Sequence, residues 1–268
     1  MSAEHLTVYR GHRLALDDVS LATPGGRITA VVGGDGAGKT TLLEALVGLV
    51  LPESGTVDSP GRERIGYMPS GAGSWADLTV DENVAFVGGS YGLSQKALAE
   101  RAESLLTRAG LADARDRLAG KLSGGMRNKL GFCLAMLHQP ELVVLDEPST
   151  GVDPVSRVEL WRLISEAAAL GTAVVLSTSY MDEAERAGFV LVLERGRELL
   201  SGSPDEIVAS FPGEVVMTST PQRPQFAWRS GEQFREWWPD GAPDGDPVSL
   251  TLEDVSIVAS LRAQGQAA

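Results

Sequence analysis

Cysteine is almost absent from this sequence, which contains a single one, Cys133, among 268 residues. One thiol cannot form a disulfide within the chain, so no disulfide framework holds the fold together. Apolar residues recur at helical spacing around Cys133, at Phe132, Leu134 and Leu137. This pattern predicts a core position on a helix rather than a reactive thiol.

Long apolar runs are also missing. No stretch approaches the ~20 consecutive apolar residues that a membrane-spanning helix needs. The N-terminus has no basic segment followed by an apolar one, so we expect no secretory signal and a cytoplasmic chain. Any role at a membrane is therefore expected to come through a partner. A chain of 268 residues has room for one large domain and a small addition.

Positive charge is scarce as well. Lys and Arg number 23 against 36 Asp and Glu, which gives a formal net charge of -13. Such a surface repels nucleic-acid phosphates and anionic lipids unless a local basic patch intervenes, and the sequence shows no such patch. We therefore expect no nucleic-acid partner.

Strands and helices alternate along the first 211 residues. Strand-length apolar runs predict buried strands, and helical spacing of apolar residues predicts helices between them. The strands are expected at 28–32, 65–68, 142–145 and 173–176, and the helices from 39 onward, at 94–109 and at 154–170. This alternation predicts an α/β fold with a mainly parallel core sheet. Two further strands, at 6–9 and 16–21, predict an extra β-layer before it.

The first domain is predicted to span residues 1–211. A hairpin over 189–201 and a short helix capped by Ser203 are expected to close it. Residues 212–268 are predicted to form a small accessory segment with strands at 215–218 and 225–228 and a helix near 253–262. Its aromatic residues are expected to make a small packed core, namely Phe226, Trp228, Phe234, Trp237 and Trp238. The alternative is a regulatory or dimer-contacting tail.

A phosphate-binding loop follows the strand predicted at 28–32. Its residues are Gly33, Gly34, Asp35, Gly36, Ala37, Gly38, Lys39 and Thr40, with Thr41 next on the helix. Glycines let backbone N–H groups surround phosphates, and the helix N-terminus adds a partial positive charge. Lys39 is expected to reach the β- and γ-phosphates and Thr40 to bind Mg²⁺. A merely tight turn would not explain Lys39 and Thr40 in register.

Two acidic residues follow the apolar strand at 142–145. Asp146 is expected to bind Mg²⁺, and Glu147 is expected to activate the attacking water. Lys39 is expected to be the second catalytic residue. Acidic residues also cap helices at such positions, so their value as a site depends on the phosphate-binding loop.

The motif that decides between families is Ser123-Gly124-Gly125-Met126, which stands before an apolar helix and ahead of Asp146. In this order with the other two motifs, it resembles the signature of ABC-type ATPases. The resemblance covers roughly residues 5–210 and implies a P-loop NTPase fold with an antiparallel β-layer and a helical subdomain at about 70–138. It also implies ATP and Mg²⁺ as cofactors. In this family the signature turn faces the γ-phosphate held by a second subunit in a head-to-tail dimer.

Further residues match the family one by one. Tyr9 matches the aromatic residue that stacks on adenine, with ordinary strand packing as the alternative. Asp153 matches the end of the loop through which subunits sense each other, and the resemblance implies that it belongs to the nucleotide-binding residues. The phrases Tyr67-Met68-Pro69 and Tyr180-Met181-Asp182-Glu183-Ala184 resemble drug- and antibiotic-export ATPases of the ABC-2 type. Membership would imply a separate polytopic membrane permease, with the ATPase peripheral on the inner face of the cell membrane.

Two positions depart from the family pattern. Ser70 stands where the family has a glutamine that contacts Mg²⁺ and water, and Ser179 stands where it has a histidine that contacts the γ-phosphate. Serine reaches less far and carries no charge near neutral pH, so we expect ATP binding with slow hydrolysis at this chain's own site. The alternative is that waters or neighbouring groups fill both gaps.

Two rival functions stay open at this stage. One is a soluble ABC-type ATPase of the iron–sulphur assembly, repair or translation class, against which the sequence has no long coiled-coil insertion and no second ATPase half. The other is a regulatory subunit that binds ATP without hydrolysing it, which Ser70 and Ser179 would favour.

Overall fold

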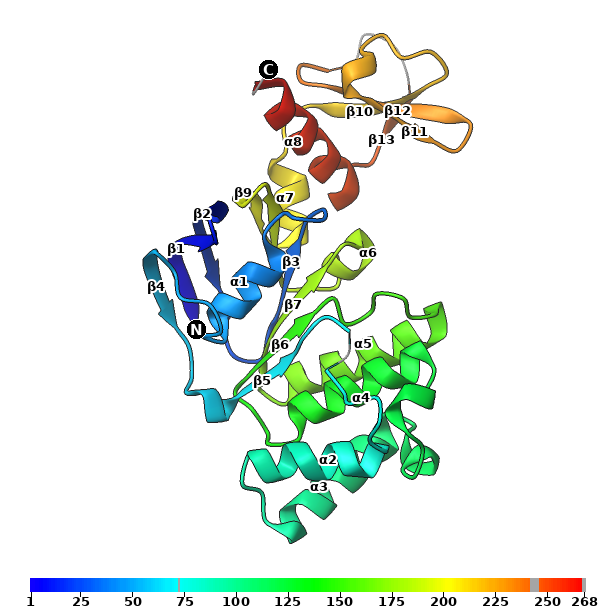
Figure 1. Ribbon diagram of the computed structural model, residues 1–268. Coiled ribbons are helices and arrows are strands. Elements are labelled where there is room, and N and C mark those ends of the chain that lie inside the picture. Colours follow the sequence, from blue (N-terminus) through cyan, green and yellow to red (C-terminus); the bar gives the residue numbers. More distant parts are fainter. Residues whose placement is uncertain (72, 242–245, 267–268) are drawn as a thin grey trace.

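A central six-stranded sheet organises the fold (Figure 1). The computed structural model describes residues 1–71, 73–241 and 246–266. The sheet order is β5-β6-β7-β3-β8-β9, in which every pair is parallel except β8 with β9. The strands are β3 (Ile28–Val32), β5 (Ile65–Met68), β6 (Leu142–Asp146), β7 (Ala173–Thr178), β8 (Phe189–Glu194) and β9 (Arg197–Gly202). All positions of β3, β6 and β7 are buried, which explains their unbroken apolar runs and confirms the predicted parallel core.

A three-stranded antiparallel sheet forms the second layer, in the order β2-β1-β4. Its strands are β1 (Ser2–Arg10), β2 (Arg13–Ala22) and β4 (Ser54–Asp58). Helix α1 (Lys39–Leu46) packs between the two sheets through Leu42 and Leu43. Strand β4 was not predicted, because this edge strand is mostly exposed and carries few apolar residues.

The other face of the central sheet is covered by helices, which Figure 1 shows gathered at the end of the molecule opposite the C-terminal sheet. They are α2 (Val80–Ser90), α3 (Gln95–Arg108), α4 (Gly124–Met136) and α5 (Pro154–Ala169), with 3-10 turns at Arg62–Arg64, Ala112–Ala114 and Ala119–Lys121. Helix α2, which the sequence analysis missed, begins with a capping box of Thr79 and Glu82. Cys133 of α4 is buried as predicted, and burial raises the pKa of its thiol to about 12.

The chain continues through α6 (Met181–Ala184) and α7 (Pro204–Ser210) into a four-stranded C-terminal sheet. That sheet has the order β11-β12-β10-β13, with β10 (Glu214–Thr218), β11 (Ala227–Ser230), β12 (Gln233–Trp238) and β13 (Asp246–Val248). As predicted, Ser203 caps α7, in a capping box with Glu206. None of the helices in the described ranges is both long enough and apolar enough to cross a membrane.

Two expectations about the C-terminal segment need correction. The strand predicted at 225–228 is a 3-10 turn at Pro224–Phe226 followed by β11, because proline at 224 favours a turn. The aromatic core is smaller than expected. Trp237 is buried beside Phe226 and Trp228, whereas Phe234 and Trp238 lie against the guanidinium groups of Arg229 and Arg223.

Helix α8 (Leu252–Gln266) joins the C-terminal segment to the ATPase part (Figure 1). Leu252 and Val255 belong to the apolar core beneath the central sheet, while Val258 belongs to the small core with Trp237. Ser260 Oγ also donates a hydrogen bond to Glu194 Oε2 at the end of β8, at 3.0 Å. Helix α8 thus anchors the C-terminal sheet to the ATPase part through a shared core.

Val255→Ala is expected to lower the free energy of unfolding of the whole chain by about 2 kcal/mol, because it removes two buried methyl groups from that shared core. Denaturant unfolding followed by circular dichroism measures the change. Val158→Ala, at a position that is 58% exposed, is the control and is expected to change stability little. An equally small effect of Val255→Ala would show that α8 is not part of the cooperative core.

Candidate nucleotide-binding site

The loop between β3 and α1 is packed so closely that glycine is required at two positions. A methyl group on Gly38, which has φ 110°, would lie 2.7 Å from the Leu16 side chain and 2.8 Å from the Ala15 carbonyl oxygen. A methyl group on Gly33 would lie 2.4 Å from the Leu193 carbonyl oxygen. The loop backbone therefore carries no side chain at these two positions. It lies beside the N-terminus of α1, where the helix dipole favours anions.

Lys39 is buried at the mouth of this loop. Its Nζ donates to the carbonyl oxygens of Gly33 and Gly34, at 2.7 and 3.3 Å. The same ammonium lies 3.3 Å from Glu147 Oε1. A cavity of about 280 Å³ opens beside it, and every phosphate-loop residue from Gly34 to Thr41 lines that cavity, together with Glu147. The structure thus brings the predicted loop and the predicted catalytic acid together.

The hydroxyl of Thr40 and the carboxylate of Asp146 meet at the end of β6. Thr40 Oγ1 donates to Asp146 Oδ2 at 2.9 Å, and Ser177 Oγ donates to Asp146 Oδ1 at 2.6 Å. Hydroxyl and carboxylate oxygens are the hard donors that Mg²⁺ prefers. The donor set therefore fits the predicted metal, and Thr40 and Asp146 are the residues that would hold it.

Glu147 is set in place by its backbone and by two neighbours. It has φ 49°, a left-handed conformation that is uncommon outside glycine. Its backbone N–H donates to Ser177 Oγ at 2.8 Å, and its Oε2 accepts from Thr150 Oγ1 at 3.1 Å. The carboxylate therefore faces Lys39 at the cavity instead of continuing along the strand.

Ser177 is a functional position that sequence reasoning missed. One hydroxyl on β7 accepts from Glu147 and donates to Asp146, so it fixes both acidic residues at once. The available signal was register, since Asp146 pairs with Ser177 across neighbouring parallel strands. A hydroxyl at the carboxyl end of the next strand could have been predicted to meet the acid.

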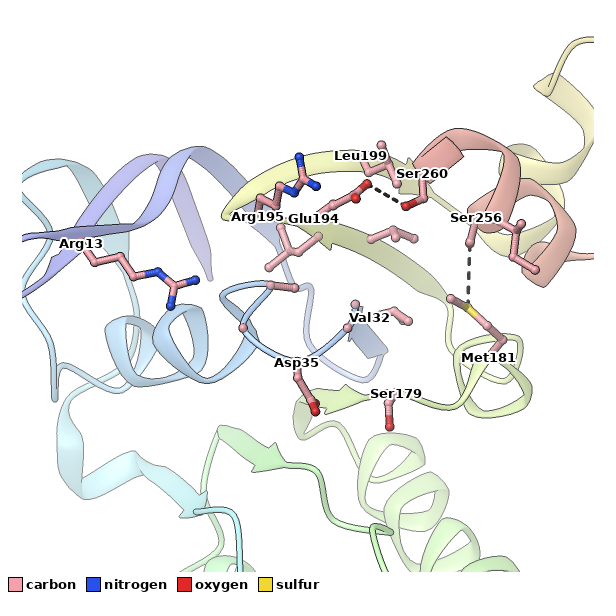
Figure 2. A pocket seen from close by; sticks show the side chains of 17 residues that line it. Arg13, Val32, Asp35, Ser179, Met181, Glu194, Arg195, Leu199, Ser256 and Ser260 are labelled. Atoms are coloured by element: carbon pink, nitrogen blue, oxygen red, sulfur yellow. Dashed lines mark hydrogen bonds between the residues drawn. The ribbon is translucent and has the colours of Figure 1, made fainter. Parts of the chain in front are cut away.

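Ser179 lies at the edge of a second and larger cavity, of about 490 Å³, beside the phosphate-binding loop (Figure 2). Gly33 to Ala37 line the same cavity. The segment around Ser179 is held by Thr178, whose Oγ1 accepts from the Tyr180 N–H at 3.0 Å and donates to Glu183 Oε2 at 2.7 Å. Ser179 itself is exposed, so the structure places a short hydroxyl beside the loop.

Ser70 follows β5 and is exposed. Ser70 is not among the described residues that line the two cavities, so its predicted role at the metal stays a prediction.

The signature turn has a packing role within the chain. Ser123 caps α4, with its Oγ accepting from the Met126 N–H at 3.2 Å. A methyl group on Gly125 would lie 2.4 Å from the Ser156 side chain, and one on Gly124 would lie 3.2 Å from the Gly151 carbonyl oxygen. Both glycines therefore let α4 approach the start of α5. The turn is not among the described residues that line the Lys39 cavity.

Asp153 has an equally local role. Its Oδ1 accepts from the backbone N–H groups of Val155 and Ser156, at 3.1 and 3.0 Å, which caps α5 before Pro154. These hydrogen bonds, above all from Ser156, lower the pKa of the Asp153 carboxyl group. Its predicted contact with nucleotide stays a prediction.

Two arginines, Arg10 and Arg13, line the Lys39 cavity on the hairpin side. Tyr9 on β1 is 49% exposed, but the described lining residues contributed by the β1–β2 hairpin are Arg10, Arg13 and Ala15. Arg10 forms an ion pair with Glu44 of α1. Sequence reasoning missed both arginines because exposed strand-end residues carry no apolar pattern. A role for Tyr9 at the base stays a prediction.

The comparisons with known proteins agree with this geometry. A family model described as ABC transporter matches residues 16–150. The probable multidrug ABC transporter ATP-binding protein YbhF of Escherichia coli is 39% identical over 206 residues, covering 73% of this chain and 36% of that protein. The Nod factor export ATP-binding protein I of Cupriavidus metallidurans is 35% identical over 214 residues, covering 76% of this chain and 71% of that protein.

Among solved structures, cbiO1 of Clostridium perfringens, described as part of the ABC transporter complex cbiONQ, has a TM-score of 0.69 and 26% identity. The match covers 78% of this chain and 90% of that one. The chain spans only about a third of YbhF, the first of these relatives. With the loop, the acidic pair and the signature turn in place, the chain belongs to the ABC transporter family, as an ATP-binding subunit.

Proposed function

We propose that this chain binds and hydrolyses ATP to drive a separate membrane permease, which exports drug-like or lipophilic compounds. The observation that carries the proposal is that Lys39, Thr40 and Glu147 line one cavity, where Thr40 is hydrogen-bonded to the buried Asp146. The relatives named for multidrug and Nod factor export support the direction and the class of cargo.

Each residue of the site has a chemical task in this proposal. Lys39 and the loop backbone bind the β- and γ-phosphates, and Thr40 and Asp146 hold Mg²⁺, which when bound offsets phosphate charge. Glu147 orients water and accepts its proton. Lys39 lies 3.3 Å from Glu147, so binding of phosphate at the ammonium would release the carboxylate toward the water.

A second ATP-binding subunit completes the site in this proposal. The turn at Ser123 is an exposed helix N-terminus. It is not among the described residues of the same chain that line the Lys39 cavity. A head-to-tail pair, of two copies or with an unlike partner, would bring one subunit's turn onto the phosphates held by the other.

An aromatic groove supports the partnership with a permease. Exposed aromatic side chains on and beside α2 line a cavity of about 470 Å³, with Trp75 and Phe86 in edge contact at 4.5 Å between ring centroids. Trp75 is 47% and Phe86 52% exposed. Tyr67 and Pro69, at the end of β5 just before Ser70, form another wall. We expect an amphipathic helical segment on the cytoplasmic side of the permease to fill this groove, at the inner face of the membrane.

Phe86→Asp is expected to reduce recovery of the permease in a pull-down by about tenfold, because it places a charge in an apolar contact. Co-purification with the membrane protein encoded beside this chain measures the effect. Leu170→Asp, at a 79% exposed position at the end of α5, is the matched control. Recovery that is equal in Phe86→Asp and the control, or the lack of any polytopic partner, would contradict the proposal.

A regulatory subunit that does not hydrolyse ATP is the second candidate. It is favoured by the exposed Ser179 beside the loop and by the absence of Ser70 from the described lining of the site. Turnover by the purified chain separates the two candidates.

A further inference from the structure

We infer that Arg13 binds the phosphate chain of the nucleotide as a second cation beside Lys39. This inference rests on the proposed function, because it assumes that the Lys39 cavity receives a nucleoside triphosphate. It adds a binding residue from the β1–β2 hairpin, outside every motif recognised in the sequence.

The cationic side chains around the cavity differ in whether they have an anionic partner. Three cationic side chains line it, and two of them have anionic partners in the structure. Lys39 lies 3.3 Å from Glu147, and Arg10 is paired with Glu44. Arg13 has no ion pair within 4.0 Å among the described residues, so its charge is available to a ligand.

The side chain of Arg13 also lies close to the phosphate-binding loop. A methyl group built on Gly36 would lie 3.7 Å from Arg13 Nη2, so the guanidinium reaches the middle of the phosphate-binding loop. Arg13 lines both the Lys39 cavity and the larger cavity beyond the loop. Figure 2 shows its side chain extending from β2 toward the loop and the start of α1. The guanidinium therefore lies within reach of phosphates bound by this loop.

The surroundings of the cavity are acidic, and a bound polyphosphate would need positive charge to offset them. Asp35 and Glu147 line this cavity, and Asp146 is hydrogen-bonded to Thr40 at its wall. The chain as a whole carries a formal charge of -13. These charges oppose a polyanion. A guanidinium offers a planar pair of donors that suits phosphate oxygens, and charge-assisted hydrogen bonds of this kind are the strong ones. Arg13 therefore offsets the acidic surroundings where the loop backbone alone would not.

The experiment compares three variants with two probes. Arg13→Ala removes the cation, Arg13→Lys keeps the charge without the planar pair of donors, and Arg27→Ala is the control. Arg27 is an exposed arginine just before β3, at the opposite end of that strand, so its loss changes the net charge equally. Dissociation constants for MgATP and for inorganic tripolyphosphate are measured by calorimetry at low and high salt.

Arg13→Ala is expected to weaken both probes by about tenfold at low salt, less at high salt, with Arg13→Lys between it and the unmodified chain. An affinity equal to that of Arg27→Ala would overturn the inference, as would a loss for ATP without a loss for tripolyphosphate, which would place Arg13 on the base. Failure of the unmodified chain to bind ATP would instead refute the proposed function itself.

Discussion

Ser179→His is expected to raise the ATP turnover of the purified chain by about 10²-fold, since a positioned acid–base or electrostatic group contributes about that much or more. Ser179 lies beside Gly34 and Asp35 at the larger cavity, on a segment already held by Thr178 and Glu183. A histidine ring there would extend toward the phosphates from a preformed position. Phosphate release at saturating MgATP measures the gain.

The control for this gain is Ser219→His, which places the same ring at an exposed position in the C-terminal segment and is expected to leave turnover unchanged. Adding Ser70→Gln to Ser179→His tests whether the second departure also limits the rate. Brisk hydrolysis by the unmodified chain would refute the slow-site hypothesis. Turnover that stays low in both variants, with ATP affinity intact, would show that other residues limit the chemistry.

Glu147→Gln is expected to lower turnover by about 10²–10⁴-fold, because it removes the group proposed to accept the proton of water. ATP binding should be retained or strengthened. Glu147 is 3.3 Å from Lys39, and loss of the negative charge leaves the ammonium free for phosphate. Turnover is measured in the Ser179→His background, where the fall is large enough to resolve.

Glu141→Gln is the matched control, since Glu141 stands just before β6 and makes an exposed ion pair with Arg64. It is expected to change turnover little. Glu147→Gln should in contrast trap bound ATP, which a filter-retention assay detects. Turnover in Glu147→Gln equal to that of the control would mean that the carboxylate is not the proton acceptor.

Features carried by short stretches of sequence were predictable. A buried strand, a glycine-rich loop and a helix are consecutive from Ile28 to Leu46, so spacing alone located Lys39 and Thr40. Asp146 and Glu147 likewise followed from the apolar run of β6. Edge strand β4 and the capping box of α2 were missed, because the apolar patterns there are weak and partial.

Features made by contacts between distant segments were missed. Ser177 meets Asp146 only because β6 and β7 are neighbours in register. Arg13 reaches Gly36 because the β1–β2 hairpin lies against the loop. The glycines of the signature turn, expected at phosphates, are also required by the packing of α4 on α5.

The sequence by itself therefore determined the α/β class, the phosphate-binding loop, the acidic pair and the family, because each depends on residues close together in the chain. Tertiary structure alone decided which side chains surround the cavity, how one hydroxyl holds two acidic residues, and that α8 shares the main core. The physical reason is that strand register and close packing bring together residues whose separation along the chain carries no local pattern.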